Sequence, residues 1–162
     1  LLHLATLSNL EHLQFTETQL TGTGLVHLNC LNELELLSLY DTQITDAALQ
    51  NLSPLTKLRV LTLGKTKITD TGLAYLKGLT TLRNLDLSGT SISDVGLTNL
   101  KMLSELDSLR IYDTAVADVG LAHLKGLTKL KLLVIGETQI SDASVEDLKA
   151  ALPNCRIYRI EE

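Results

Sequence analysis

One motif recurs six times along the chain at a constant interval of 24 residues, without any insertion or deletion between copies. Its most regular marker is a threonine, found at Thr18, Thr42, Thr66, Thr90, Thr114 and Thr138. Two apolar residues precede each threonine and one aliphatic residue follows it, as Leu61, Leu63 and Ile68 do around Thr66. Self-similarity at this period is the signature of a solenoid, in which each repeat packs only against its neighbours.

Within one repeat the apolar pattern changes period. Leu61-Thr62-Leu63 alternates, which predicts a short strand, whereas apolar residues recur every third position from Leu73 to Leu79, which predicts a short helix. We expect Asp70 and its equivalents to cap these helices, and Gly78 and Gly126 to end them in the left-handed conformation. The predicted fold class is α/β: a right-handed solenoid, shaped as a horseshoe, with a parallel concave sheet and short convex helices.

The pattern of residues 82–106 resembles the leucine-rich repeat, and the resemblance covers the whole chain. The stretch Ile-Thr-Asp-x-Gly-Leu at residues 68–73 is most similar to the cysteine-containing subtype, except that threonine replaces the usual Asn or Cys after the strand. Repeats of this length also resemble those of bacterial, planctomycete-type arrays. The resemblance implies a non-enzymatic module that binds a protein or peptide on its concave sheet face.

The two ends of the chain differ in character. We interpret residues 1–162 as a single domain, with a partial repeat at 1–10, full repeats at 10–142 and a C-terminal cap at 143–162. The leucines of residues 1–10 match the helical half of a repeat, so we expect a fragment of a longer protein whose uncapped leucine edge supports self-association. At the other end, Pro153 stops the last helix and charged residues block further strand pairing.

Composition and spacing exclude several classes of function. A net charge of −5 argues against nucleic-acid binding, and no apolar run is long enough for membrane insertion. Cys30 and Cys155 lie about five repeats apart, or roughly 20 Å or more, which is too far for a disulfide. The sequence contains no catalytic constellation, metal-ligand spacing or cofactor-binding motif, and it indicates no compartment.

The residues that face away from the core on each strand vary between repeats, and they carry our candidate binding site. Two tyrosines there are each followed by Asp and Thr, and charged residues lie between them. Aromatic anchors beside charges are typical of interfaces. The predicted ligand-binding residues are Tyr40, Asp41, Asp86, Arg110, Tyr112 and Asp113. The alternatives are an ordinary hydrated strand surface, and a structural spacer in a longer array whose binding site lies elsewhere.

Overall fold

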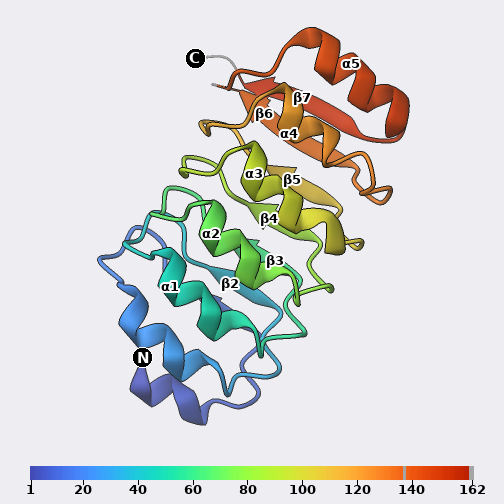
Figure 1. Cartoon of the computed structure of the whole chain (residues 1–162). Helices are drawn as coiled ribbons and strands as arrows, with labels where there is room; N and C mark the ends of the chain where they lie inside the picture. The colour runs from blue at the N-terminus through green and yellow to red at the C-terminus, as the bar shows by residue number, and fades with distance from the viewer. Residues whose placement is uncertain (137, 161–162) are drawn as a thin grey trace.

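The computed structural model describes residues 1–136 and 138–160, which form one arc of stacked repeats (Figure 1). Within these residues the strands make a single open parallel sheet whose order follows the chain. The strands are β1 (His12–Gln14), β2 (Leu36–Ser38), β3 (Val60–Thr62), β4 (Asn84–Asp86), β5 (Ser108–Arg110), β6 (Leu132–Gly136) and β7 (Arg156–Ile160). The predicted solenoid is therefore confirmed.

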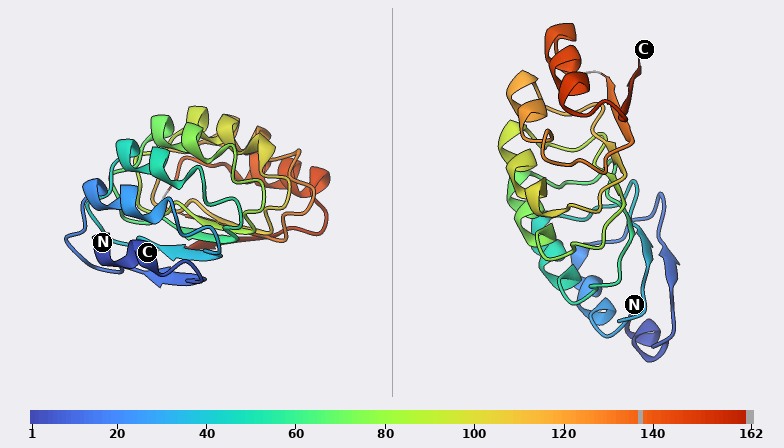
Figure 2. Two further views of the ribbon diagram at one scale, coloured as in Figure 1. Left: turned by 90° about the horizontal axis from the view of Figure 1, so that it is seen from below. Right: turned by 90° about the vertical axis from the view of Figure 1, so that its right-hand side faces the viewer.

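Short helices line the side of the molecule opposite the sheet (Figure 2). The α-helices are α1 (Asp46–Leu49), α2 (Asp70–Leu73), α3 (Asp94–Leu97), α4 (Asp118–Ala122) and α5 (Asp142–Ala151). The 3₁₀ helices are η1 (Leu2–Thr6), η2 (Gly22–Leu28), η3 (Gln50–Leu52), η4 (Ala74–Leu76) and η5 (Thr98–Met102). Each α-helix from α1 to α3 runs directly into a 3₁₀ helix, so apolar residues spaced by three, such as Leu73 and Leu76, both face the core.

The core is a stack of leucine layers held in register by the sheet. Each strand residue pairs with the residue 24 positions later, as Leu61 does with Leu85. Leu61, Leu85 and Leu109 are each at most 1% exposed. Because the register is constant, side chains at equivalent positions lie in rows that run across the strands.

The repeated threonines close the turn after each strand. The hydroxyl of Thr90 donates to the carbonyl of Leu87 at 2.6 Å, and Thr42, Thr66 and Thr114 make the equivalent bond. At these four positions the hydroxyl satisfies a carbonyl of the loop backbone. The hydroxyls of Thr18 and Thr138, at the two ends of the row, are buried without a hydrogen-bond partner among the described residues.

The repeated aspartates join neighbouring repeats, which corrects the predicted capping role. Each is the first residue of its helix, and the preceding residue holds the cap position. The carboxylate therefore extends sideways: Asp46 accepts from the backbone N–H of Thr69 at 2.8 Å and from its hydroxyl at 2.6 Å. Asp70 binds Ser93 in the same way, at 2.7 and 2.6 Å, and Asp94 and Asp118 continue the series.

A small residue in the following repeat accommodates each of these carboxylates. Gly72 lies against the carboxylate of Asp46, and Gly96 lies against that of Asp70. In the first repeat the pattern is reversed, because Gly22 stands at the aspartate position and faces Ala48. A shallow hollow of about 590 Å³ opens there, between the first two repeats.

The prediction that Gly78 and Gly126 end their helices in the left-handed conformation is wrong. The glycines with positive φ are Gly89 and Gly136, both at the ends of strands. The helices end in 3₁₀ or simple turns, which satisfy their carbonyls without a left-handed residue. Both cysteines are free, Cys30 exposed and Cys155 buried, as their predicted separation required.

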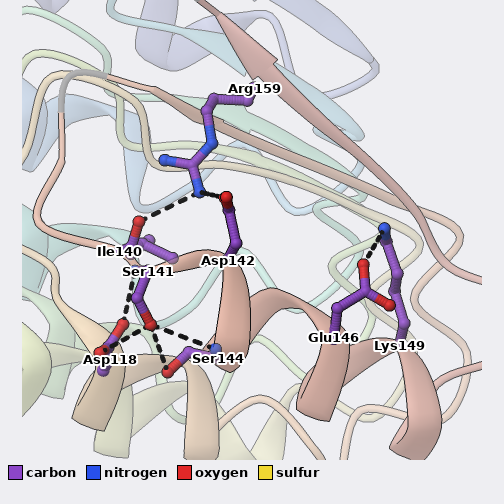
Figure 3. Close-up of polar contacts among 8 residues, drawn as sticks. All are labelled: Asp118, Ile140, Ser141, Asp142, Ser144, Glu146, Lys149 and Arg159. Carbon is purple, nitrogen blue, oxygen red and sulfur yellow. Dashed lines mark hydrogen bonds and ion pairs between the residues drawn. The ribbon is translucent and has the colours of Figure 1, made fainter.

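The two ends of the arc differ in the exposure and the contacts of their side chains. No residue of η1 is buried, and Leu2 and Leu7 are 62% and 47% exposed. At the C-terminal end, Nη2 of Arg159 donates to the carbonyl of Ile140 at 3.0 Å and contacts Asp142 at 3.2 Å (Figure 3). These contacts tie β7 to the start of α5, the longest helix of the described residues.

Candidate interaction surface

The inner face of the sheet carries rows of side chains that alternate with the core leucines. One row follows the last residues of strands β2 to β5 and consists of Ser38, Thr62, Asp86 and Arg110, all partly exposed. The next row, two residues later, includes Tyr40 and Tyr112, which are also partly exposed, and Gly64 and Ser88, which are buried. The predicted surface is therefore shallow in its middle and raised at the two tyrosines.

A further row was missed by the sequence analysis. It begins each strand and comprises His12, Leu36, Val60, Asn84, Ser108, Leu132 and Arg156. Leu36, Val60 and Leu132 are partly exposed there, so the inner face has apolar area beside the charged residues. The alternation of side chains along a strand could have predicted this row. The residues directly before and after the buried leucine of a strand point to the same face of the sheet.

The residue that directly follows the repeat position of Tyr40 and Tyr112 adopts a left-handed backbone conformation. Its φ is 53° at Asp41, 53° at Lys65 and 52° at Asp113, and Glu17 and Gly89 share it. Glu137, which is next in this row by sequence, lies outside the described residues. Aspartate tolerates this conformation better than most residues, whereas lysine and glutamate rarely adopt it. The turn therefore projects a charged side chain outward at the end of most strands.

Tyr40 lies across the next repeat and meets a cation there. A Cβ at Gly64 would be only 2.9 Å from Cδ2 of Tyr40, so the absence of a side chain lets the ring lie flat. Nζ of Lys65 is 5.7 Å from the centroid of that ring, a cation–π distance. Tyr40 raises the pKa of Lys65 above the ordinary value, first through hydrogen bonding of its hydroxyl and then through the charge of that group. Desolvation lowers this pKa, and the charges of Asp41 and Tyr112 raise it further.

Asp86 and Arg110 are directly opposite in the register of β4 and β5. No ion pair joins them, among the residues that the structure describes. Oδ1 of Asp86 instead accepts from the backbone N–H and the hydroxyl of Ser88, at 3.0 and 2.6 Å. One carboxylate oxygen of Asp86 thus supports the turn after its own strand.

The structure divides the six predicted site residues into three pairs. Tyr40 and Asp41 follow β2, Asp86 and Arg110 lie side by side on β4 and β5, and Tyr112 and Asp113 follow β5. Three strand spacings separate the two tyrosine–aspartate pairs, which is about 14 Å at ~4.8 Å per strand. The six residues share one face without forming a single cluster.

Opposite charges spaced by 24 residues form a ladder along the edge where the chain enters the strands, and the sequence analysis did not use it. Lys57 contacts Glu33 at 2.6 Å, and Lys129 contacts Glu105 at 2.6 Å. The remaining pairs of this edge are Glu35 with Arg59 and Asp107 with Lys131. Exposed pairs of this kind contribute less than about 1 kcal/mol each, so the ladder is a surface feature of the stack.

A short series of hydroxyls and carboxylates connects the last two helices (Figure 3). Asp118 accepts from the backbone N–H of Ser141 at 2.7 Å and from its hydroxyl at 3.0 Å. These bonds, with a further contribution from Ser144, lower the pKa of Asp118, while desolvation opposes them. These bonds continue the aspartate contacts between neighbouring repeats, and none of them involves a histidine.

Comparison with known proteins identifies the family to which this fold belongs. A sequence model described as a leucine-rich repeat matches residues 55–77 and 78–101. Internalin C2 from Listeria monocytogenes superimposes with a TM-score of 0.83 over 99% of this chain, at 30% sequence identity. The chain is a leucine-rich repeat protein. A search of curated proteins gave no match.

Two more solved structures share the leucine-rich repeat fold. A second internalin from Listeria monocytogenes has a TM-score of 0.71 and 25% identity over 96% of this chain. A leucine-rich repeat protein from Leptospira interrogans has a TM-score of 0.70 and 24% identity over 96% of it. This chain spans 66%, 49% and 38% of the three solved chains, in the order given.

Metal ligation and membrane spanning have no counterpart among the described residues. No group of three or more His, Cys, Asp or Glu side chains in residues 1–136 and 138–160 is arranged to hold a metal ion. No helix in that part of this leucine-rich repeat protein is long and apolar enough to cross a membrane.

Proposed function

We propose that this leucine-rich repeat protein is a non-enzymatic interaction module that binds a protein or peptide on the inner face of its sheet. The observation that carries the proposal is the pair of partly exposed tyrosines, Tyr40 and Tyr112, each beside an exposed aspartate at the end of a strand. Rigid aromatic side chains lose little conformational freedom on binding, and they are enriched among the residues that dominate interface energies.

The scaffold supports the same function. Every strand is paired, and the leucines beneath the inner face are buried, so the surface is formed before a partner arrives. A preformed surface avoids much of the ordering cost of association. The leucine-rich repeat fold commonly mediates protein–protein interaction, and a shallow sheet surface suits a protein better than a small molecule.

The test compares three forms of the chain in a pull-down from the source organism, read by mass spectrometry. They are the native chain, the inner-face variant Tyr40→Ala/Arg110→Glu/Tyr112→Ala, and the outer-face variant Tyr75→Ala/Lys77→Glu/Met102→Ala. Circular dichroism first establishes equal folding. We expect a partner that the inner-face variant loses and the outer-face variant keeps. Retention by the inner-face variant overturns the proposal, and no partner for any form favours the spacer function.

We also propose that the N-terminal end of the arc mediates self-association. Leu2 and Leu7 are exposed, and Leu1, Leu10, Leu13 and Phe15 are only partly buried against the core. Repeat stacks normally cover this edge with a polar cap or a further repeat. A second copy of the chain would bury the same leucines.

A further inference from the structure

Lys65 shows how this surface holds a basic side chain. Its ammonium group lies 5.7 Å from the centroid of the Tyr40 ring, and Asp41, which is exposed, follows that tyrosine directly. An aromatic face and a carboxylate together favour a cation, each by a modest amount at an exposed site. The lysine comes from the repeat after the tyrosine, 25 residues further along the chain.

The same two residues recur at the same repeat position in Tyr112 and Asp113. Tyr112 is partly exposed, and Asp113 is exposed with a left-handed φ of 52°, close to the 53° of Asp41. Oδ2 of Asp113 and Cγ of Lys65 both lie beside Gly89, 3.4 and 3.1 Å from where a Cβ would be, so the stem of Lys65 passes on that side of the carboxylate. The second pair therefore offers the same aromatic and acidic groups as the first.

The second pair has no basic side chain of its own over the ring. In the described residues the one cation placed over a tyrosine is Lys65, over Tyr40, and no ion pair there includes Asp41 or Asp113. The sequence gives the reason, because the residue 25 positions after Tyr112 is a glutamate and not a lysine. Arg110, the last residue of β5 and two residues before Tyr112, also makes no such contact among the described residues.

We propose that Tyr112 and Asp113 bind a lysine or arginine side chain of the partner protein, with the cation over the Tyr112 ring as that of Lys65 lies over the Tyr40 ring. This inference rests on the proposed function and adds to it the chemistry of the partner: a basic side chain presented on an exposed segment. The occupied pair, Tyr40 and Asp41, is expected to bind no external cation while Lys65 is present.

The test is a nuclear magnetic resonance titration with a short peptide, acetyl-Gly-Ser-Lys-Ser-Gly-amide, and with the same peptide carrying norleucine instead of lysine. Norleucine keeps the aliphatic chain and removes the charge. We expect the lysine peptide, at millimolar concentrations, to shift the backbone amides of Gly89, Tyr112 and Asp113 saturably, and the norleucine peptide to leave them unchanged. Equal shifts with both peptides, or shifts that map elsewhere, overturn the inference.

Two conservative variants locate the binding groups. Asp113→Asn keeps a residue that tolerates the left-handed conformation, and Tyr112→Leu keeps an apolar side chain. Each is expected to weaken lysine-peptide binding by about threefold, in line with the modest energies of exposed ion pairs and cation–π contacts. Asp147→Asn, which removes an exposed carboxylate from helix α5, is the matched control and is expected to leave the affinity unchanged.

Removal of the internal lysine provides a second test. In Lys65→Ala the first pair loses its own cation, so the lysine peptide is expected to produce a second set of shifts, at the amides of Tyr40 and Asp41. Failure of this second set to appear contradicts the equivalence on which the inference rests. The peptide titration does not depend on the pull-down: a partner lost by the inner-face variant without peptide binding leaves the proposed function standing and removes only this inference.

Discussion

The carboxylate of Asp70 occupies the space that a side chain at residue 96 would need, and Gly96 leaves that space open. The same carboxylate accepts two hydrogen bonds from Ser93, so one aspartate ties its own repeat to the next. We expect Gly96→Ala to displace the carboxylate and to lower the free energy of unfolding by roughly 1–3 kcal/mol, as overpacking does. Urea titration measures the change.

Gly78 is the matched control for this substitution. A Cβ there meets nothing within 4 Å and φ is not positive, so Gly78→Ala is expected to leave stability unchanged or slightly increased. Adding Asp70→Ala to Gly96→Ala removes the group that the new methyl displaces. The two changes together should then cost less than the sum of their separate effects, and strict additivity would show that Gly96 does not serve Asp70.

The acid limb of the stability curve depends in part on Asp118. Its bonds from Ser141 lower its pKa in the folded state, so its contribution to stability is present above the ordinary value of 3.8 and is lost as the pH falls below it. Ser141→Ala removes the hydroxyl and keeps the backbone N–H. We expect the pKa of Asp118 to rise in this variant, as followed by its carboxyl carbon shift, and Ser53→Ala to leave it unchanged.

The row of threonines contains its own control. Thr90 donates a buried hydrogen bond to Leu87 at 2.6 Å, whereas the buried hydroxyl of Thr18 has no partner among the described residues. Thr90→Val is expected to lower stability by about 1 kcal/mol. Thr18→Val is expected to be neutral or stabilising, because it removes an unsatisfied polar group. Equal losses in thermal unfolding would contradict the assigned role of the hydroxyl bond.

The assignment of inner and outer faces predicts a large difference between two neighbouring strands. Leu85 is 1% exposed in the middle of the core, so Leu85→Ala should cost roughly 2–5 kcal/mol. Arg110 is partly exposed and makes no ion pair among the described residues, so Arg110→Ala should change stability by less than about 0.5 kcal/mol. Comparable losses of stability for the two variants would show that the buried and exposed faces of the strands are assigned wrongly.

Self-association through the N-terminal leucines predicts a mass that rises with protein concentration. Leu7→Glu places a charge on the exposed edge and is expected to restore the monomer mass in light scattering. Val119→Glu is the control, since Val119 is 64% exposed on α4, far along the chain from that edge. A monomer at high concentration for the native chain argues against this association.

Most of the fold follows from the sequence because the same pattern is repeated six times. The alternation of Leu61 and Leu63, and the exact interval to Leu85, fix the strands, their register and the buried face. The role of Asp70 could not be deduced in this way, since an aspartate before a helical pattern fits a cap equally well. Only the stacking of repeats shows that its carboxylate reaches Ser93 instead.

The sequence predicts which residues form the candidate surface, but not the contacts between their side chains. Strand alternation places Tyr40, Arg110 and Tyr112 on the inner face, as predicted. The contact of Lys65 with Tyr40 depends on side-chain direction and on the left-handed turn at Lys65, a conformation that lysine rarely adopts and that the sequence does not indicate. The assignment to the cysteine-containing subtype and the boundary of the C-terminal cap remain predictions.

The exchange of roles at Gly22 and Ala48 leaves the first two repeats without the carboxylate clasp that joins the others. The hollow lined by Thr21, Val26 and Thr45 lies at the seam between them. A solenoid whose joints are unequal opens first at its weakest joint. We therefore expect unfolding of this chain to start at its N-terminal end, so that amide hydrogens of the first repeat exchange faster than those around Tyr112.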